Sequence, residues 1–283
     1  MTFSAFAQSH GLVIGDVYPS ERIMRCGTDD KPRSTNGAYF FNGQRGFIFR
    51  WDAEAKPIWW NDANVTPWTD AEKREWSAKK RAAEQSREDG YRRAGVAAQK
   101  IIAACKPETH NYLRNKKLPD ALGLVNVEHE LIVPMRHVTN NDLVGCQTIK
   151  WLTDSREWQK KMTYEMRAKG AVFRLGSKHA TETFLVEGYA TGLTLELALR
   201  RLNLNAAVLI CFSANNLTHV APLVHGAKFA FADNDKSGTG EAAAKAAGIA
   251  YCMSPVEGFD ANDHFQKFGL LPLCQLILTL RAK

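Results

Sequence analysis

Short apolar segments alternate with helical segments over the C-terminal part of the chain. Residues 184–186, 207–212, 228–232 and 249–253 are largely apolar, and each run is followed by a turn and a segment of helical composition. Strands that are apolar on both faces are typical of parallel sheets with helices packed on each side. The pattern predicts an α/β fold, with a four-stranded parallel sheet flanked by helices in a domain at residues 181–283.

Two further patterns precede this domain. Residues 69–105 are rich in Ala, Glu, Lys and Arg and contain no proline, which predicts a long charged linker helix. Thr69 is the expected N-cap of this helix, and Glu72, three residues later, is the expected capping-box partner. Residues 107–180 predict a small basic α/β subdomain, with a helix at 111–116 and strands at 131–135, 143–151 and 171–175.

Residues 1–65 predict a β-rich N-terminal domain. Strands are expected at 38–41, 46–51 and 57–60, and Phe-Asn-Gly-Gln at 41–44 is typical of a hairpin turn. Cys26 has no partner cysteine at ligand spacing, so we expect a metal-free domain and no zinc. All seven tryptophans lie between Trp51 and Trp158; they could stack on unpaired bases, although burial in a core is the commoner role.

Cysteine usage and hydropathy indicate the compartment. The six cysteines are scattered singly, which favours a reducing, cytoplasmic setting. No apolar run approaches the roughly 18 residues of a membrane span, and the N-terminal residues lack a basic segment followed by an apolar one, so we expect no signal peptide. The sequence therefore gives no reason to expect a membrane partner.

The net charge of +7 is unevenly distributed along the chain. Residues 181–283 contain 8 Lys and Arg against 9 Asp and Glu, whereas residues 1–180 contain 29 against 21, a net of +8. A basic part joined to a carboxylate-bearing part suits the binding of a polyanion next to a metal site. A solvated basic surface without any partner would give the same composition.

Three groups of acidic residues follow the predicted parallel strands. Glu187 follows the first strand, Asp233 and Asp235 follow the third, and Asp260 and Asp263 follow the fourth. Ligands of such sheets bind at the carboxyl ends of the strands. Clustered carboxylates are ligands that Mg²⁺ or Mn²⁺ takes in proteins, so the five residues predict a metal site with Glu187 as a candidate general acid or base. Each group alone is also typical of a turn, and Asp263 could simply cap the helix that follows it.

These motifs resemble the Toprim domain of bacterial primases. The matching segments are Leu-Val-Glu-Gly-Tyr at 185–189, Asp-Asn-Asp-Lys-Ser-Gly at 233–238 and Gly-Phe-Asp-Ala-Asn-Asp at 258–263. Residues 110–119, 131–135 and 160–176 are similar to the small domain that precedes Toprim in phage and plasmid primases. The resemblance implies that Glu187, Asp233 and Asp235 carry metal and catalysis. It also implies that basic residues lie along template and nucleotide, namely Lys116, Lys117, Lys160, Lys161, Arg167, Lys169 and Arg174.

The resemblance implies a DNA primase-like nucleotidyltransferase. Such an enzyme joins ribonucleoside triphosphates into short RNA primers on a single-stranded DNA template, with Mg²⁺ as cofactor. Primases of this family usually begin with a zinc-binding β-domain, for which residues 1–65 would be a metal-free remnant. The chain has no Walker A sequence, so a replicative helicase would be a separate protein. The alternatives are a Toprim-type metal-dependent nuclease and a non-catalytic DNA-binding replication accessory protein.

Overall fold

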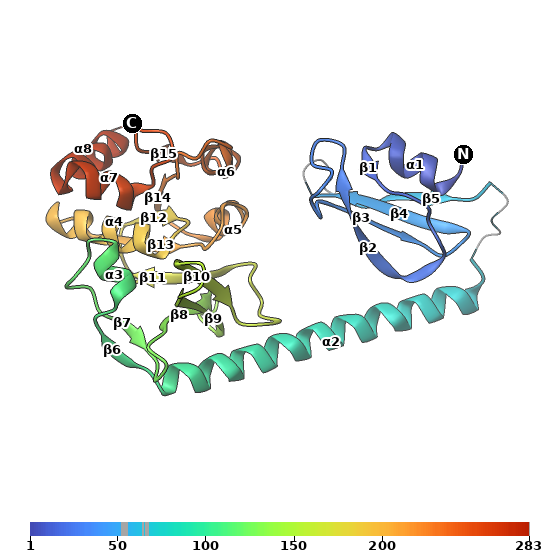
Figure 1. The fold of residues 1–283 in the computed structure, drawn as a ribbon, viewed down its shortest axis with the longest axis horizontal. Helices are drawn as coiled ribbons and strands as arrows, with labels where there is room; N and C mark the ends of the chain where they lie inside the picture. Colours follow the sequence, from blue (N-terminus) through green and yellow to red (C-terminus); the bar gives the residue numbers. More distant parts are fainter. Residues whose placement is uncertain (52–55, 64, 66–67, 283) are drawn as a thin grey trace. The chain divides into compact units, whose positions relative to one another are not determined.

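The protein folds into two compact units, residues Met1–Lys80 and Arg81–Lys283. The computed structural model describes residues 1–51, 56–63, 65 and 68–282; positions 52–55 and 64 of the predicted N-terminal domain fall outside these ranges. Both units combine helices with strands, which confirms the predicted α/β composition (Figure 1). No helix in the described ranges is both long and apolar enough to cross a bilayer.

The first unit is an antiparallel sheet with a helix on one face. Helix α1 (Phe3–Ser9) packs through Phe3 and Ala7 against Ile48 of the sheet. The predicted hairpin is confirmed, because β3 and β4 pair around a turn in which the Asn42 side chain accepts the Arg45 N–H at 2.8 Å. The sheet has five strands in sequence order: β1 (Leu12–Val13), β2 (Ser20–Thr28), β3 (Gly37–Phe41), β4 (Arg45–Arg50) and β5 (Ile58–Asn61).

Aromatic side chains also line the other face of this sheet. Trp51 and Trp59 each keep 52% of their surface exposed, so the expectation that tryptophans are mainly buried is wrong for both. The Arg25 guanidinium lies 3.7 Å from the centre of the Trp51 ring. A cation held against an aromatic face in this way gains roughly 0.5–1 kcal/mol at an exposed site.

The long charged helix α2 runs from Asp70 to Ala103. Its predicted capping box is present: the Glu72 N–H donates to the Thr69 hydroxyl at 3.2 Å, and Glu72 Oε2 accepts the Thr69 N–H at 2.7 Å. The last turns of α2 are anchored by small residues, because Ala94 and Ala98 are buried against strands of the second unit.

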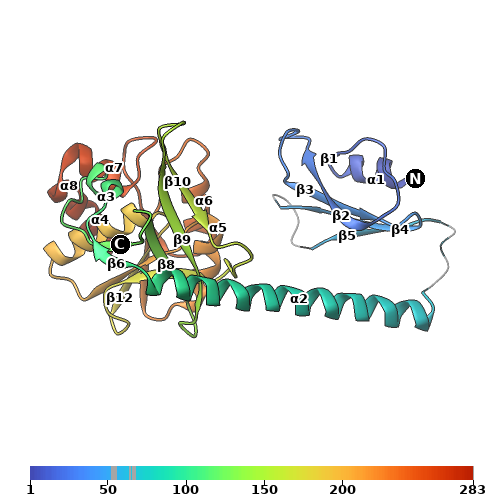
Figure 2. The same cartoon turned by 60° about the horizontal axis from the view of Figure 1, so that its bottom comes forward.

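The second unit contains a sheet that is antiparallel in its first part and parallel in its second. Strand β10 pairs with β9, β9 with β8 and β8 with β11, all antiparallel (Figure 2). Short strands β6 and β7 extend the antiparallel part, and α3 lies between them in sequence. The bounds are β6 (Lys106–Glu108), α3 (Asn111–Asn115), β7 (Gly123–Val125), β8 (Leu131–His137), β9 (Leu143–Leu152), β10 (Glu157–Met162) and β11 (Ala171–Leu175).

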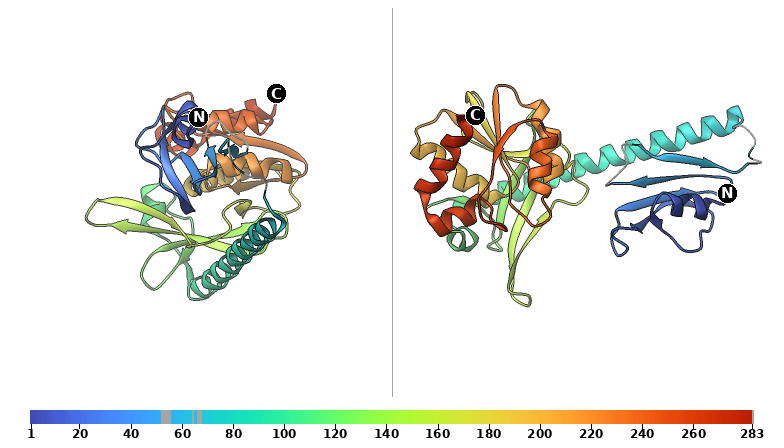
Figure 3. Two further views of the ribbon diagram at one scale, coloured as in Figure 1. Left: turned by 90° about the vertical axis from the view of Figure 1, so that its right-hand side faces the viewer. Right: turned by 90° about the horizontal axis from the view of Figure 1, so that it is seen from above.

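The parallel part has the strand order β13-β12-β14-β15, and all three neighbouring pairs are parallel. Helices α4, α7 and α8 lie to one side of these strands and α5 and α6 to the other (Figure 1); α7 and α8 are the adjacent red helices of Figure 3. The bounds are β12 (Glu182–Val186), α4 (Tyr189–Arg201), β13 (Ala206–Ile210), α5 (Ala214–Val220), β14 (Ala227–Phe231), α6 (Thr239–Ala246), β15 (Ala250–Cys252), α7 (Ala261–Phe268) and α8 (Leu270–Arg281).

Strand β11 joins the two parts into one sheet. It pairs antiparallel with β8 on one edge and with β13 on the other. The predicted segments 107–180 and 181–283 therefore share a continuous hydrogen-bonded sheet. The largest core cluster also crosses the two segments, because Leu131 and Ile149 are buried together with Phe184 and Ile277.

Candidate acidic site at the carboxyl ends of the parallel strands

Glu187 and Asp233 follow two neighbouring parallel strands. Glu187 comes directly after β12, and Asp233 comes two residues after the end of β14, which pairs with β12. From β12 the chain passes through α4 on one face to β13, and from β14 it passes through α6 on the other face to β15. Two parallel strands whose connections leave in opposite directions open a crevice at their carboxyl ends, where ligands of α/β sheets bind.

The Glu187 side chain is half-buried at the carboxyl end of β12. Burial raises its pKa, the nearby Asp235 raises it further, and a hydrogen bond from the Ala214 backbone N–H lowers it. Its own carbonyl accepts the Phe212 N–H at 2.9 Å, which fixes the strand end to the start of the β13–α5 connection. A carboxyl group with a raised pKa is better able to exchange a proton near neutral pH.

Asp233 is the most perturbed carboxyl group of the site. Burial and the charges of Asp260, Glu187, Asp235 and Asp263, in that order, raise its pKa to about 7. Its Oδ1 atom is buried and has no hydrogen-bond partner in the described part of the chain. An unpaired buried carboxylate oxygen is costly unless a proton or a cation compensates it.

Asp235 lies in a different environment from Asp233. It is exposed, and its pKa is lowered mainly by a hydrogen bond from the Ser237 hydroxyl, 2.7 Å from Oδ1, with help from the Thr239 N–H. The two aspartates therefore differ in protonation near neutral pH. Gly240 allows α6 to start this close to the site, because a Cβ there would lie 2.6 Å from the Asp233 carbonyl oxygen.

Asp260 and Asp263 form a capping box at the start of α7. The Asp263 N–H donates to Asp260 Oδ1 at 2.8 Å, and Asp263 accepts the Asp260 N–H. The suggestion that Asp263 caps this helix is thus corrected, because Asp260 is the N-cap and Asp263 is its partner. Asp260 Oδ2 also accepts the Thr191 hydroxyl at 3.0 Å, which ties α7 to α4.

The donor set suits Mg²⁺ in its chemistry. Five carboxyl groups lie at one end of the sheet, and the buried Asp233 Oδ1 lacks a partner. Hard divalent cations prefer such oxygen ligands. Among the residues that the structure describes, no three His, Cys, Asp or Glu side chains are gathered closely enough to hold a metal ion. Ligation by the five acids, and the absence of zinc, remain predictions.

Two of the predicted basic residues lie near the acidic site. Lys116 follows α3, and its Nζ is 3.7 Å from Asp263 Oδ1. Lys160 on β10 lies over the Tyr112 ring, 5.6 Å from its centre. Tyr112 is buried, its hydroxyl has no partner in the described chain, and burial is the main reason that its pKa rises to about 12. Asp260 and Asp263 also raise this pKa, so Tyr112 lies between the basic and acidic groups.

The other basic residues are spread over the second unit. Arg167 contacts α2, with its Nη2 3.9 Å from Glu88 Oε1. Arg174 on β11 pairs with Leu209 on β13, and Leu209 pairs in turn with Leu185 on β12. The backbone of Arg174 therefore lies in register with Leu185, two residues before Glu187. Burial lowers its pKa. Three more are Lys117 after α3, Lys161 on β10 and Lys169 in the loop before β11.

Sequence reasoning did not single out Thr191 or Tyr112 as site residues. Thr191 holds Asp260 through its hydroxyl, and Tyr112 connects α3 to the lysines and aspartates. Thr191 could have been suspected, because it lies two residues after the Glu-Gly-Tyr motif at 187–189. No protein-family model and no curated protein sequence matches the chain.

Proposed function

We propose that the second unit is a Toprim-type catalytic region and that the protein is a DNA primase-like nucleotidyltransferase of the cytoplasm. The observation that carries the proposal is that half-buried Glu187 and Asp233, whose Oδ1 is unpaired among the described residues, follow the carboxyl ends of the paired parallel strands β12 and β14. Unpaired carboxylate oxygen at the carboxyl ends of parallel strands is suited to a cation that carries phosphate chemistry.

Glu187, Asp233 and Asp235 would hold the metal, and Asp260 and Asp263 would support it. When bound, Mg²⁺ would neutralise negative charge on the phosphoryl group that is being transferred. In primer synthesis a ribonucleotide 3′-hydroxyl attacks the α-phosphorus of a triphosphate, a new P–O bond forms, and pyrophosphate leaves. Glu187, whose pKa is raised by burial, suits the acceptor of the hydroxyl proton.

The basic part of the second unit favours nucleic acid as the partner. Residues 81–180 contain 18 Lys and Arg against 11 Asp and Glu, so they account for +7 of the +8 carried by residues 1–180. A single-stranded DNA template and ribonucleoside triphosphates are both polyanions that such a segment attracts. Lys116 contacts Asp263, and Lys160 lies over the Tyr112 ring. Any helicase would be a separate partner.

The test is a primer-synthesis assay with matched variants. The wild-type protein is incubated with single-stranded DNA of mixed sequence, Mg²⁺ and labelled ribonucleotides, and both new oligonucleotides and template fragments are measured. We expect oligonucleotides from the wild type, a loss of about 100-fold or more in Glu187→Gln, and full activity in the exposed control Asp154→Asn. Metal-dependent template cleavage without oligonucleotides would favour a nuclease, and neither product would favour a non-catalytic DNA-binding protein.

A further inference from the structure

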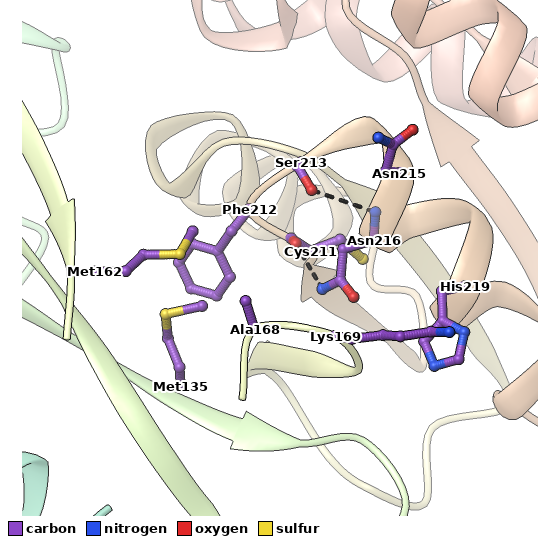
Figure 4. A pocket seen from close by; sticks show the side chains of 10 residues that line it. All are labelled: Met135, Met162, Ala168, Lys169, Cys211, Phe212, Ser213, Asn215, Asn216 and His219. Carbon is purple, nitrogen blue, oxygen red and sulfur yellow. Dashed lines mark hydrogen bonds between the residues drawn. The ribbon is translucent and has the colours of Figure 1, made fainter. Parts of the chain in front are cut away.

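A pocket of about 280 Å³ lies in the second unit, beside the strand end that carries Glu187. Its walls come from β8, from the end of β10 and the loop before β11, and from the segment that leads from β13 into α5 (Figure 4). Cys211 N–H donates to the Val186 carbonyl at 2.8 Å, and Phe212 N–H donates to the Glu187 carbonyl. Ligand pockets in proteins typically measure about 300–1,000 Å³, so this pocket lies close to the lower end of that range.

One half of the pocket is apolar. The Phe212 ring lies next to the Met135 and Met162 side chains, with Ala168 nearby (Figure 4). Phe212 has a φ of +64°, a conformation that bulky residues rarely adopt and that is retained mainly where the site depends on it. An aromatic ring flanked by flexible thioethers is a suitable contact surface for a flat aromatic ligand.

The other half of the pocket is polar and carries positive charge. The Lys169 side chain extends towards His219 on α5 (Figure 4), and none of the lining residues in the described chain is an Asp or Glu. Burial lowers the pKa of His219, and the nearby Lys169 and His137 lower it further, so His219 offers a neutral imidazole and Lys169 supplies the positive charge. The exposed Asn215 side chain has no partner in the described residues and is free to bind a ligand. This half therefore suits an anion.

Asn216 joins the two walls of the pocket. Its buried side chain accepts the Gly170 N–H at 2.7 Å and donates to the carbonyls of Ala171 at 2.7 Å and Cys211 at 2.8 Å. All of its hydrogen-bonding atoms are thereby used within the protein. Asn216 is a positioning residue, which holds the Lys169 loop at a fixed distance from the Phe212 segment.

We propose that this pocket binds a ribonucleoside triphosphate, with the base on Phe212, Met135 and Met162 and the phosphates at Lys169 and His219. An aromatic contact surface beside a cationic one matches the flat base and the anionic phosphates of a nucleotide. The role of this nucleotide as the incoming substrate rests on the proposed function, whereas its binding does not. The backbone contact between Phe212 and Glu187 ties the base-binding end of the pocket to the strand end that carries the acidic site.

Calorimetric titration with ATP, in EDTA and without template, tests the pocket apart from the metal site. We expect wild-type protein to bind ATP, Lys169→Gln to bind it about tenfold more weakly, and Phe212→Leu to bind it at least about fivefold more weakly through loss of stacking. Phe212→Leu keeps the apolar bulk, and unchanged thermal melting checks its fold. Lys106→Gln, an exposed substitution outside the pocket, should bind ATP as the wild type does. Photo-cross-linking with 8-azido-ATP should label the pocket residues.

Each contrary result overturns the inference. Such results are no ATP binding by the wild type, equal affinity in the Lys169→Gln and Phe212→Leu variants, and cross-links outside the pocket. Displacement of ATP by oligo(dT) but not by UTP would assign the pocket to the template strand instead. Primer synthesis is measured on the same samples, so that ATP binding without any primer product would reject the proposed function and leave the pocket assignment intact.

Discussion

Replacing Asp233 by Asn should stabilise the protein in a pH-dependent way. In the folded chain the pKa of Asp233 is raised from 3.8 to about 7. At pH 8 the group is ionised in both states, and ionisation costs the folded state about 1.36 kcal/mol for each of roughly 3 pKa units, or about 4 kcal/mol. The amide of the variant carries no charge but still leaves a polar atom without a partner. We therefore expect the free energy of unfolding at pH 8 to rise by about 2 to 4 kcal/mol in Asp233→Asn.

The sign of the effect follows from the direction of the shift. Below pH 3.8 the carboxyl is protonated in both states, so wild type and Asp233→Asn should have the same free energy of unfolding. As the pH rises from 3.8 towards about 7, the free energy of unfolding of the wild type should fall relative to that of Asp233→Asn. Above pH 7 the difference between the two proteins should stay constant. Urea unfolding at pH 4, 5.5, 7 and 8.5 without divalent cations measures the difference, with the exposed Asp154→Asn as the matched control.

Magnesium provides a second readout for the same variant. If Asp233 is a ligand, Mg²⁺ should raise the stability of the wild type at pH 8 and leave Asp233→Asn nearly unchanged, because a ligand stabilises only the state that binds it. The difference in stability between the two proteins should therefore shrink as the Mg²⁺ concentration is raised. A variant that is no more stable than wild type at pH 8, or a difference that does not vary with pH, would refute the account of a buried, repelled carboxylate.

Three further predictions concern other parts of the chain. Elemental analysis of protein purified without added metal should find far less than one zinc per chain, and a stoichiometric zinc that survives dialysis would contradict this. The Lys160→Ala, Lys161→Ala double variant should weaken binding to single-stranded DNA and reduce the slope of log affinity against log salt by about 1 to 2; an unchanged slope would exclude contacts to phosphates. Thr69→Ala should lower the stability of the first unit by about 1 kcal/mol in urea unfolding, and no change would show that the capping box on α2 contributes little.

Local pattern was sufficient for the strands that are continuous apolar runs in the sequence. Strands β12 to β15 and their helices were predicted to within a few residues, because continuous apolar runs and intervening turns leave few alternatives. Strand β10 was not predicted. It is an edge strand with the sequence Glu-Trp-Gln-Lys-Lys-Met and mostly exposed side chains, so its strand conformation depends on pairing with β9 and not on its own pattern.

The candidate site could be predicted only for residues that come directly after strands. The placement of Glu187 and Asp233 was predicted from their positions in the sequence alone, because the carboxyl ends of parallel strands meet at one edge of a sheet. The different protonation of Asp233 and Asp235 could not be predicted, because it is decided by burial and by the positions of neighbouring charges, which only the tertiary structure provides. The pocket at Phe212 could not be predicted from the sequence either. Its lining residues come from three segments that are distant in the sequence, and none of these segments alone has a pattern that indicates a binding site.

The position of β11 in the sheet limits where this protein can be cut. A protein truncated between residues 180 and 181, where the charge changes, would lose β11 and leave β13 with a row of unpaired backbone groups along one edge. An unpaired strand edge promotes association between chains, so the acidic half expressed alone should aggregate. A fragment that carries the acidic residues as a folded piece therefore has to begin before β11.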